Sequence, residues 1–470
     1  MHFHGENLKD FSDDYSNLGE LLPKITVTPP GPNSVKQTGI LKKHESLSGI
    51  SDSDLRKGKV PVIWRYAKGC NVIDVDGNIY IDLSAGLGVV ALGYSHPLIM
   101  EAINSQSGKL MHSPSKSNPH VERVELVEKL AKITPPALNK SFLSSSGALA
   151  VEIAMKAAKA YKKTYWFVAF HGGFHGNNMQ GALSLTAFKA FRRPYYPLLP
   201  GIVFVPFPYC YRCAFGKEYP SCDLQCVRFL EYTITNPATG VGDVAAVVVE
   251  PVQGVAGWIV PPNEFLKGVR KICDENNILL ILDEIYTGFG RTGKLFCFEH
   301  SNITPDIIAV GKGMASGFPM AAAIGKGEVM DSMGPHSSTF MGNPIGCACS
   351  LASINAILKM GLVERSKKIG EYFLNSLKKE TENCSIVGDV RGKGLLVGLE
   401  LVKDRRSKKP APDEAEKVVT AALKRGLIFH SGGVFGNFLR MSPPLVITEE
   451  QVDYSVGAVC EALREVEKSR

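Results

Sequence analysis

The chain has 470 residues, with 53 basic and 46 acidic side chains, a formal net charge of +7, 44% hydrophobic residues and 21% charged residues. No run approaches the roughly 20 apolar residues that a membrane span needs, and the basic residues form no long tract, so neither membrane insertion nor nucleic-acid binding is expected. This length predicts an enzyme-sized globule of two domains, or one large domain with a smaller lobe.

The compartment is predicted from the first residues and the cysteines. Residues 1–6 lack the basic-then-apolar pattern of a signal peptide and are too acidic for a usual transit peptide. Eleven cysteines, an odd number, fit reduced thiols better than a disulfide framework. We therefore expect a cytoplasmic protein.

The N-terminal part begins with a polar stretch. Residues 1–40 contain Pro29-Pro30-Gly31-Pro32, which predicts an extension that lies along another surface rather than a domain. Residues 17–22 are helix-like and are a candidate for packing on a partner subunit. Residues 72–82 alternate around Asp76-Gly77, a strong turn signal, and predict a β-hairpin.

A serine-glycine turn lies farther along. A helix at about 119–132 and a strand at 141–143 precede Ser144-Ser145-Ser146-Gly147, and residues 148–156 are strongly helical in propensity. The first N–H groups of a helix have no partner within it, and together with the helix dipole they bind anions. The pattern predicts an anion site at the start of this helix.

Two more strands are expected at 166–170 and 247–249. The first leads into Phe170-His171-Gly172-Gly173-Phe174-His175, and the second ends in Glu250-Pro251. An amphipathic helix over 263–275 connects the second of these strands to the next one, which predicts a βαβ crossover.

Residues 278–325 hold the strongest signal. Residues 278–282 are apolar throughout, as a parallel strand covered on both faces requires, and they end in Asp283-Glu284. Because open α/β sheets bind ligands at the carboxyl ends of their strands, Asp283 is expected to face a ligand. A glycine-rich turn at 287–293 and a strand at 307–310 follow. Lys312 then stands between two glycines at the end of that strand.

Four cysteines cluster in one loop-like segment. Cys210, Cys213, Cys222 and Cys226 form a Cys-x2-Cys and a Cys-x3-Cys pair, a spacing compatible with zinc. The linker between the pairs is shorter than is usual for paired zinc knuckles, so we predict no metal site.

The C-terminal part predicts an α+β domain. A strand at 395–402, an amphipathic helix at 413–425 and a short strand at 438–441, which contains Arg440, follow one another. Residues 448–451 form a capping box for a final helix that reaches about residue 466.

The ordered motifs at 283–293, 305–307, 311–312 and 317–319 resemble the signature of the class III aminotransferases. The resemblance runs from about residue 60 to the C-terminus. It implies an α/β protein of the aspartate-aminotransferase-like fold type I, with a large domain around a mostly parallel central sheet and a smaller α+β domain. The expected parts are an N-terminal extension (1–40), the N-terminal part of the small lobe (41–95), a large cofactor-binding domain (96–344) and a C-terminal small domain (345–470).

The resemblance implies pyridoxal 5'-phosphate as the cofactor. Lys312 would form a Schiff base with its aldehyde, and Asp283 would accept a charge-assisted hydrogen bond from its protonated ring nitrogen. An anionic partner keeps that nitrogen protonated, so that the ring accepts electrons. A lysine released from the imine then moves the proton between carbon atoms. Lys312 and Asp283 are therefore the expected catalytic residues.

The resemblance also implies further contacts. Thr339 would reach the cofactor phosphate of the neighbouring subunit in a homodimer, and Arg440 matches the arginine that grips a substrate carboxylate, a role that suits a guanidinium group. Phe174 would lie flat on the pyridine ring. The expected cofactor-binding residues are Ser146, Gly147, Ala148, Phe174, His175, Glu250, Asp283, Ile285, Tyr286, Lys312 and Thr339.

Four positions depart from the family pattern. Tyr94 stands where the family more often has His. Ala148 and Leu149 replace Ser or Thr followed by Glu, so one hydroxyl contact to the phosphate is missing. Val255 stands where ω-amine enzymes often carry the glutamate that pairs with the arginine, which favours α-amino acid substrates at Arg440.

The expected reaction is a two-step amino transfer, in which an amino acid or related amine leaves its amino group on the cofactor and a 2-oxo acid collects it. A racemase or epimerase of the same fold is the alternative, since it uses Lys312 and Asp283 but needs a second group on the opposite face of the ring. Tyr286, His175 and Tyr94 are candidates for that group. A dialkylglycine-type decarboxylase and a non-catalytic cofactor-binding protein are less favoured.

Overall fold

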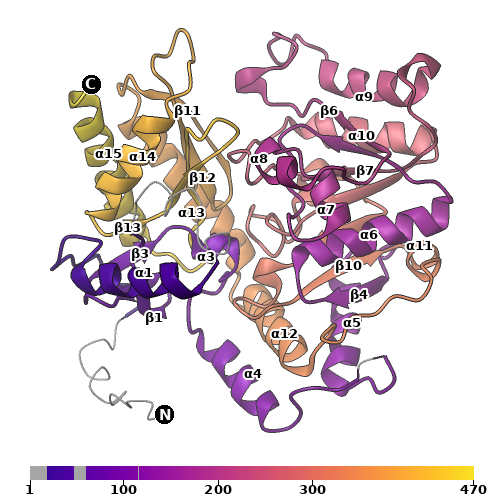
Figure 1. The fold of residues 1–470 in the computed structure, drawn as a ribbon, viewed down its shortest axis with the longest axis horizontal. Helices are drawn as coiled ribbons and strands as arrows, with labels where there is room; N and C mark the ends of the chain where they lie inside the picture. The colour runs from indigo at the N-terminus through magenta and orange to yellow at the C-terminus, as the bar shows by residue number, and fades with distance from the viewer. Residues whose placement is uncertain (1–17, 47–59, 115) are drawn as a thin grey trace.

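The computed structural model describes residues 18–46, 60–114 and 116–470 (Figure 1). Its largest sheet has seven strands in the order β4-β10-β9-β8-β7-β5-β6. Strand β10 runs antiparallel to both of its neighbours, and the other pairs are parallel. The predicted mostly parallel central sheet is confirmed. Its strands are β4 (Lys140–Ser144), β5 (Trp166–Phe170), β6 (Ile202–Val205), β7 (Val244–Val249), β8 (Leu279–Asp283), β9 (Ile307–Val310) and β10 (Ala321–Gly325).

The sheet is buried on both faces, which explains why its central strands are apolar throughout. All residues of β7 and β8 are buried. Along β7, Val248 packs in the same cluster as helix α6 (Gly147–Lys162), whereas Val247 and Val249 pack in the cluster that includes helix α10 (Asn263–Glu275). Helix α10 has the bounds that its amphipathic pattern predicts.

The neighbouring parallel strands β8 and β9 place their carboxyl ends at one edge. Asp283, the last residue of β8, pairs in register with Ala309 of β9. Lys312 lies two residues beyond the end of β9, in a short 3-10 turn. The side chains that the sequence singled out at these two strand ends therefore belong to the same edge of the sheet.

Of the two smaller sheets, one joins strands from the N- and C-terminal parts of the chain, and the other is formed by C-terminal strands alone. Strand β13 near the C-terminus pairs in parallel with β3 of the N-terminal hairpin, and Figure 1 shows these indigo and yellow elements side by side. Arg440 lies on β15 of an antiparallel sheet. The strands are β1 (Trp64–Lys68), β2 (Asn71–Asp74), β3 (Ile79–Asp82) and β13 (Leu427–Ile428) in one sheet, and β11 (Val387–Lys393), β12 (Leu396–Leu401), β15 (Phe438–Met441) and β14 (His430–Gly432) in the other.

The predicted helix at 17–22 is wrong. Residue 17 lies outside the described residues, and residues 18–20 form a turn. The Asn71 side chain fixes this segment, because its Oδ1 accepts hydrogen bonds from the N–H groups of Gly19 (2.8 Å) and Leu21 (2.9 Å). These bonds compete with helix formation. The surface that residues 18–27 lie along is the chain's own hairpin, and the helix of this region is α1 (Pro32–His44).

The remaining helices cover the sheets. Thr448 caps the final helix in the predicted capping box with Gln451. Among the described residues, no single helix is long and apolar enough to cross a membrane; α12 and α13 reach that length and apolarity only together, and they meet at a 65° bend. The longer helices are α4 (Pro97–Ser107), α5 (Val121–Ile133), α9 (Gln225–Thr235), α12 (Pro344–Lys359), α13 (Leu362–Glu380), α14 (Pro412–Leu423) and α15 (Glu449–Lys468).

Candidate active site

Lys312 is held by close packing in an uncommon backbone conformation. Its φ is +44°, in the left-handed region that residues with a Cβ rarely adopt. The glycines on both sides lie against other segments: a Cβ at Gly311 or at Gly313 would lie 3.3 Å from the Cβ of Ala321 or Ala91, respectively. Strained residues of this kind persist only where the surroundings determine them, and they cluster at functional sites.

Asp283 is buried and both of its carboxylate oxygens are engaged. His175 Nδ1 lies 2.8 Å from Oδ2, and the Ile285 N–H donates to Oδ1 at 3.1 Å. Burial of the His175 ring opposes its protonation, but the bond to Asp283 and the negative charges of Asp283 and Glu250 outweigh burial and raise the pKa of His175. The histidine therefore fixes the orientation of the Asp283 carboxylate.

Glu250 lies at the end of the neighbouring strand β7, behind this pair. Its oxygens accept hydrogen bonds from the N–H groups of Phe174 and Gly254, both at 2.9 Å. Burial raises the pKa of Glu250 to about 7, although the charge of His175 counters this rise. Glu250 thus anchors the backbone at Phe174, whose ring meets Phe191 edge-on at 5.4 Å and stays half-buried.

The predicted anion site lies at the N-terminus of α6. Ser146 is the cap residue, and its Oγ accepts the Leu149 N–H at 3.3 Å. A Cβ at Gly147 would lie 2.8 Å from Ile285 Cδ1, so only glycine lets this turn approach the segment that follows Asp283. Ala148 packs against Gly176, where an added Cβ would meet the Ala148 Cβ at 2.5 Å. The small side chain of Ala148 thus fits a tight contact.

Tyr286 connects the lysine to the C-terminal part of the chain. The Lys312 Nζ lies 4.3 Å from the centroid of the Tyr286 ring, and the Tyr286 hydroxyl lies 2.9 Å from Ser442 Oγ. Burial lowers the pKa of Lys312, while the charges of Asp283 and Glu250 counter this shift. A lower pKa increases the fraction of Lys312 that is present as the neutral, nucleophilic amine.

Arg440 faces the same site, and no carboxylate among the described residues pairs with it. Burial lowers the pKa of Arg440, and the group that counters this shift is Tyr286 rather than an acid. Its Nε is buried and has no hydrogen-bond partner in the described part of the chain. Gly432 on the neighbouring strand β14 makes room for it, since a Cβ there would lie 2.7 Å from that Nε. Val255 is half-buried and offers no charge.

The remaining predicted residues lie apart from this cluster or are already engaged. Thr339 is exposed, in the turn that follows α11 (Gly327–Asp331), and so is its neighbour Phe340. Tyr94 donates a hydrogen bond of 2.7 Å to Oδ2 of the buried Asp82. The sequence analysis did not single out Asp82 or Ser442 as site residues. In the sequence, only their positions indicate a role: Asp82 is the last residue of the hairpin, and Ser442 follows Arg440 by two residues.

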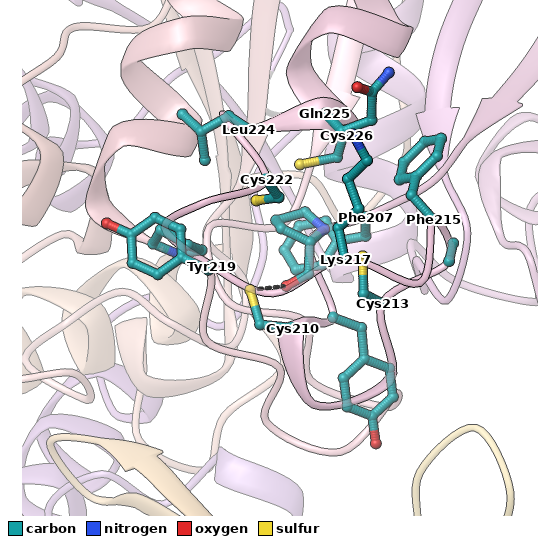
Figure 2. Close-up of a pocket in the computed structure, with 14 residues that line it drawn as sticks. Phe207, Cys210, Cys213, Phe215, Lys217, Tyr219, Cys222, Leu224, Gln225 and Cys226 are labelled. Carbon is teal, nitrogen blue, oxygen red and sulfur yellow. Dashed lines mark hydrogen bonds between the residues drawn. The ribbon is translucent and has the colours of Figure 1, made fainter.

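The four cysteines form a separate feature (Figure 2). Cys210, Cys213, Cys222 and Cys226 line a cavity of ≈ 20 Å³ together with apolar side chains, and none of the residues around Lys312 lines it. All four thiols are free, and the Cys210 Sγ donates to the Pro208 carbonyl at 3.8 Å. In residues 18–46, 60–114 and 116–470, no three His, Cys, Asp or Glu side chains are arranged to hold a metal ion.

Known proteins are similar to this chain in sequence and in fold. The sequence model of the family described as Aminotransferase class-III matches residues 53–463. The leucine/methionine racemase of Thermococcus litoralis is 38% identical to this chain, over 91% of this chain and 96% of the racemase. The 4-aminobutyrate aminotransferase of Mycobacterium leprae is also 38% identical, over 83% and 88%. The solved structure of an amine transaminase from an uncultivated Pseudomonas species, in its PLP-bound form, has a TM-score of 0.82 at 28% identity and covers 87% of this chain and 96% of its own.

Proposed function

Since this chain belongs to the class III aminotransferase family, we propose that it moves an amino group from an amino acid to a 2-oxo acid with Lys312 as its central residue. The observation that carries the proposal is the convergence of Lys312 and Asp283 at one edge of the central sheet. The predicted fold type I is confirmed by the family match and by the solved transaminase of the same fold.

The predicted cofactor, pyridoxal phosphate, is confirmed by the family, and the residues present fit it. The backbone N–H groups at Ser146, Gly147 and Ala148 suit a phosphate. Lys312 supplies an amine of lowered pKa, and the carboxylate of Asp283 suits a ring nitrogen. When bound, the cofactor supplies an aldehyde that bonds amines and a ring that accepts electrons.

The side chains around the cofactor have separate proposed roles. Lys312 holds the cofactor covalently and, once released, carries the proton at the substrate carbon. Asp283 would face the ring nitrogen, and His175 holds this carboxylate in place. Phe174 and Ile285 pack beside the ring, with Phe174 fixed through Glu250. Tyr286 lines the site next to Lys312.

Arg440 supports α-amino acids as substrates. A half-buried guanidinium without an acidic partner is stabilised by a bound carboxylate, and a bidentate contact with its planar fork also orients that carboxylate. The uncharged side chain of Val255 leaves Arg440 available in every step. The same arginine can bind the carboxylates of the amino donor and of the 2-oxo acid acceptor.

We propose a homodimer in which Thr339 contacts the phosphate in the partner's site. Exposed apolar side chains gather on α4, α5, α12 and the adjoining turns, and Figure 1 shows these helices together at the lower edge of the molecule. A patch of this kind is rare on monomers and suits a second copy. Its residues are Leu98, Met100, Leu110, Met111, Val121, Val124, Phe340, Leu358 and Met360. The eleven free thiols favour a cytoplasmic location.

Racemisation is the second candidate, because the T. litoralis relative is a racemase. It requires a proton-transfer group opposite Lys312. The three residues proposed for that role each already have a hydrogen-bond partner: His175 contacts Asp283, Tyr94 contacts Asp82, and the Tyr286 hydroxyl contacts Ser442. These contacts support amino transfer over racemisation.

The test is the dependence of turnover on a 2-oxo acid. A transaminase stops after one half-reaction unless an acceptor is present, whereas a racemase needs none. Holoenzyme is mixed with a panel of amino acids with and without 2-oxo acids, and the products are measured. Sustained turnover without any acceptor would contradict the proposal.

A further inference from the structure

The ring of Tyr286 is enclosed on three sides. Lys312 Nζ lies 4.3 Å from its centroid, and Trp258 meets it edge-on at 4.9 Å. On another side, a Cβ at Gly88 would lie 2.5 Å from Tyr286 Cε1. An aromatic face attracts an ammonium group, and the attraction grows when water is excluded. The ring therefore gives the amine of Lys312 a defined place.

The hydroxyl of Tyr286 belongs to a chain of hydrogen bonds with a defined direction. Ser442 Oγ donates to the Ser84 carbonyl at 3.2 Å. A serine hydroxyl has one hydrogen, so in the 2.9 Å contact between Tyr286 and Ser442 the tyrosine must donate. The chain runs from Tyr286 through Ser442 and ends at a carbonyl, which takes up no proton. This chain fixes the ring and does not pass a proton on.

The end of the chain is anchored by strained backbone. Residues 85–88 all have positive φ, at +48°, +57°, +65° and +80°, and two of them, Ala85 and Leu87, carry a Cβ. Left-handed conformations are energetically costly for residues that carry a Cβ. Asp82 supports the turn, since its carboxylate accepts the N–H groups of Ser84 at 2.7 Å and Gly86 at 3.1 Å. Strain held in this way marks a functional constraint.

The same framework includes the strand that carries Arg440. Ser442 is two residues beyond Arg440, and its N–H donates to the Leu83 carbonyl at 2.6 Å. One set of contacts thus fixes the place of the substrate carboxylate at Arg440 and the place of the amine at Lys312.

We propose that Tyr286 is a positioning residue: its ring holds the Lys312 amine where that amine transfers the substrate proton, and Ser442 and Ser84 hold the ring. The inference rests on the proposed amino transfer for its kinetic part only. The chain of contacts itself is a property of the folded protein, so it is testable without turnover.

The test uses holoenzymes of Tyr286→Leu, Tyr286→Phe and Ser442→Ala, with Tyr232→Phe, an exposed tyrosine, as the control. The first readout is the pH midpoint at which the absorbance of the Lys312-bound cofactor changes. Removing the ring takes away its stabilisation of positive charge at the lysine nitrogen, so Tyr286→Leu moves the midpoint to lower pH by about one unit. Tyr286→Phe and Ser442→Ala each keep the aromatic ring but remove the hydrogen bond that fixes it. They therefore shift the midpoint in the same direction by a smaller amount.

The second readout is the split between kcat and KM. The three variants lower kcat by about tenfold while KM for an α-amino acid changes little, because Arg440 is intact. A wild-type midpoint in Tyr286→Leu would overturn the role of the ring. A shift in Tyr286→Phe without one in Ser442→Ala would overturn the role of the hydrogen-bond chain. If neither the wild type nor any variant shows acceptor-dependent turnover, the proposed function is wrong. The pH midpoints of the cofactor absorbance would still decide whether Tyr286 positions Lys312.

Discussion

His175 Nδ1 and Asp283 Oδ2 lie 2.8 Å apart, and both side chains are almost fully buried. A buried carboxylate needs polar partners, and His175 provides one without occupying the oxygen that Ile285 contacts. The pair therefore stabilises a negative charge at the edge of the sheet, at the place where we assign the ring nitrogen of the cofactor.

Asp283→Asn keeps the size of this side chain and removes its charge. We expect a folded protein that binds the cofactor but has kcat lowered by about a hundredfold or more, because an uncharged partner no longer favours a protonated ring nitrogen. The measurement is kcat together with the cofactor content. Asp331→Asn, an exposed carboxylate that pairs with Lys140 at the surface, is the control. Near-normal kcat in Asp283→Asn would refute the assigned role.

Lys312→Ala removes the only amine assigned to the cofactor aldehyde. Turnover is expected to disappear, and borohydride treatment of the wild-type holoenzyme is expected to attach the cofactor to the peptide that contains Lys312. Peptide mapping by mass spectrometry checks this. Lys294→Ala, an exposed lysine directly after the glycine-rich turn, should retain activity. Cofactor found on any other lysine would show the assignment to be wrong.

Arg440→Ala tests the substrate class. Loss of a charge-assisted contact costs about 2 kcal/mol or more, so kcat/KM for α-amino acids should fall by about thirtyfold. Amines without a carboxylate should be almost unaffected, because they make no contact with the guanidinium. Arg406→Ala, on an exposed turn, is the matched control. Equal losses for both substrate types would indicate a structural role.

Thr339 is tested by mixing two inactive variants. Suppose that Thr339 acts across the interface. In a hybrid dimer of one Lys312→Ala and one Thr339→Ala subunit, one site then combines an intact Lys312 with the intact Thr339 of the other subunit. Activity should then reappear on mixing, up to about half of the wild-type sites in each hybrid. If Thr339 acts within its own chain, no site is intact and mixing restores nothing. Ser337→Ala in place of Thr339→Ala is the control.

The sequence predicted the parts of the fold that depend on local patterns. Three predicted features match the structure closely: the apolar run at 278–282, the amphipathic helix at 263–275 and the capping box at 448–451. A strand buried on both faces is apolar throughout, a helix buried on one face is amphipathic, and a helix start carries capping residues, so each feature is visible in the local sequence. The turn at residues 18–20 was missed because it is fixed by Asn71, about fifty residues away.

The candidate site was predictable where residues stand at strand ends, as Asp283 and Lys312 do. The contacts that link Tyr286 to Ser442 and Gly88 were not, since they join segments at least 156 residues apart in sequence and no local pattern records them. The His175 contact with Asp283 likewise needed the pairing of β5, β7 and β8 to bring the two segments together.

The central claim is that the substrate carbon loses its proton to Lys312 and that the amino group then leaves for an acceptor. The most direct measurement incubates one enantiomer of a good amino acid substrate with holoenzyme in deuterated water, with and without a 2-oxo acid, and follows both enantiomers and the 2-oxo product. Our account predicts stoichiometric product without acceptor, many turnovers with it, and deuterium only in the original enantiomer. Sustained formation of the deuterated opposite enantiomer without acceptor would contradict it and establish a racemase.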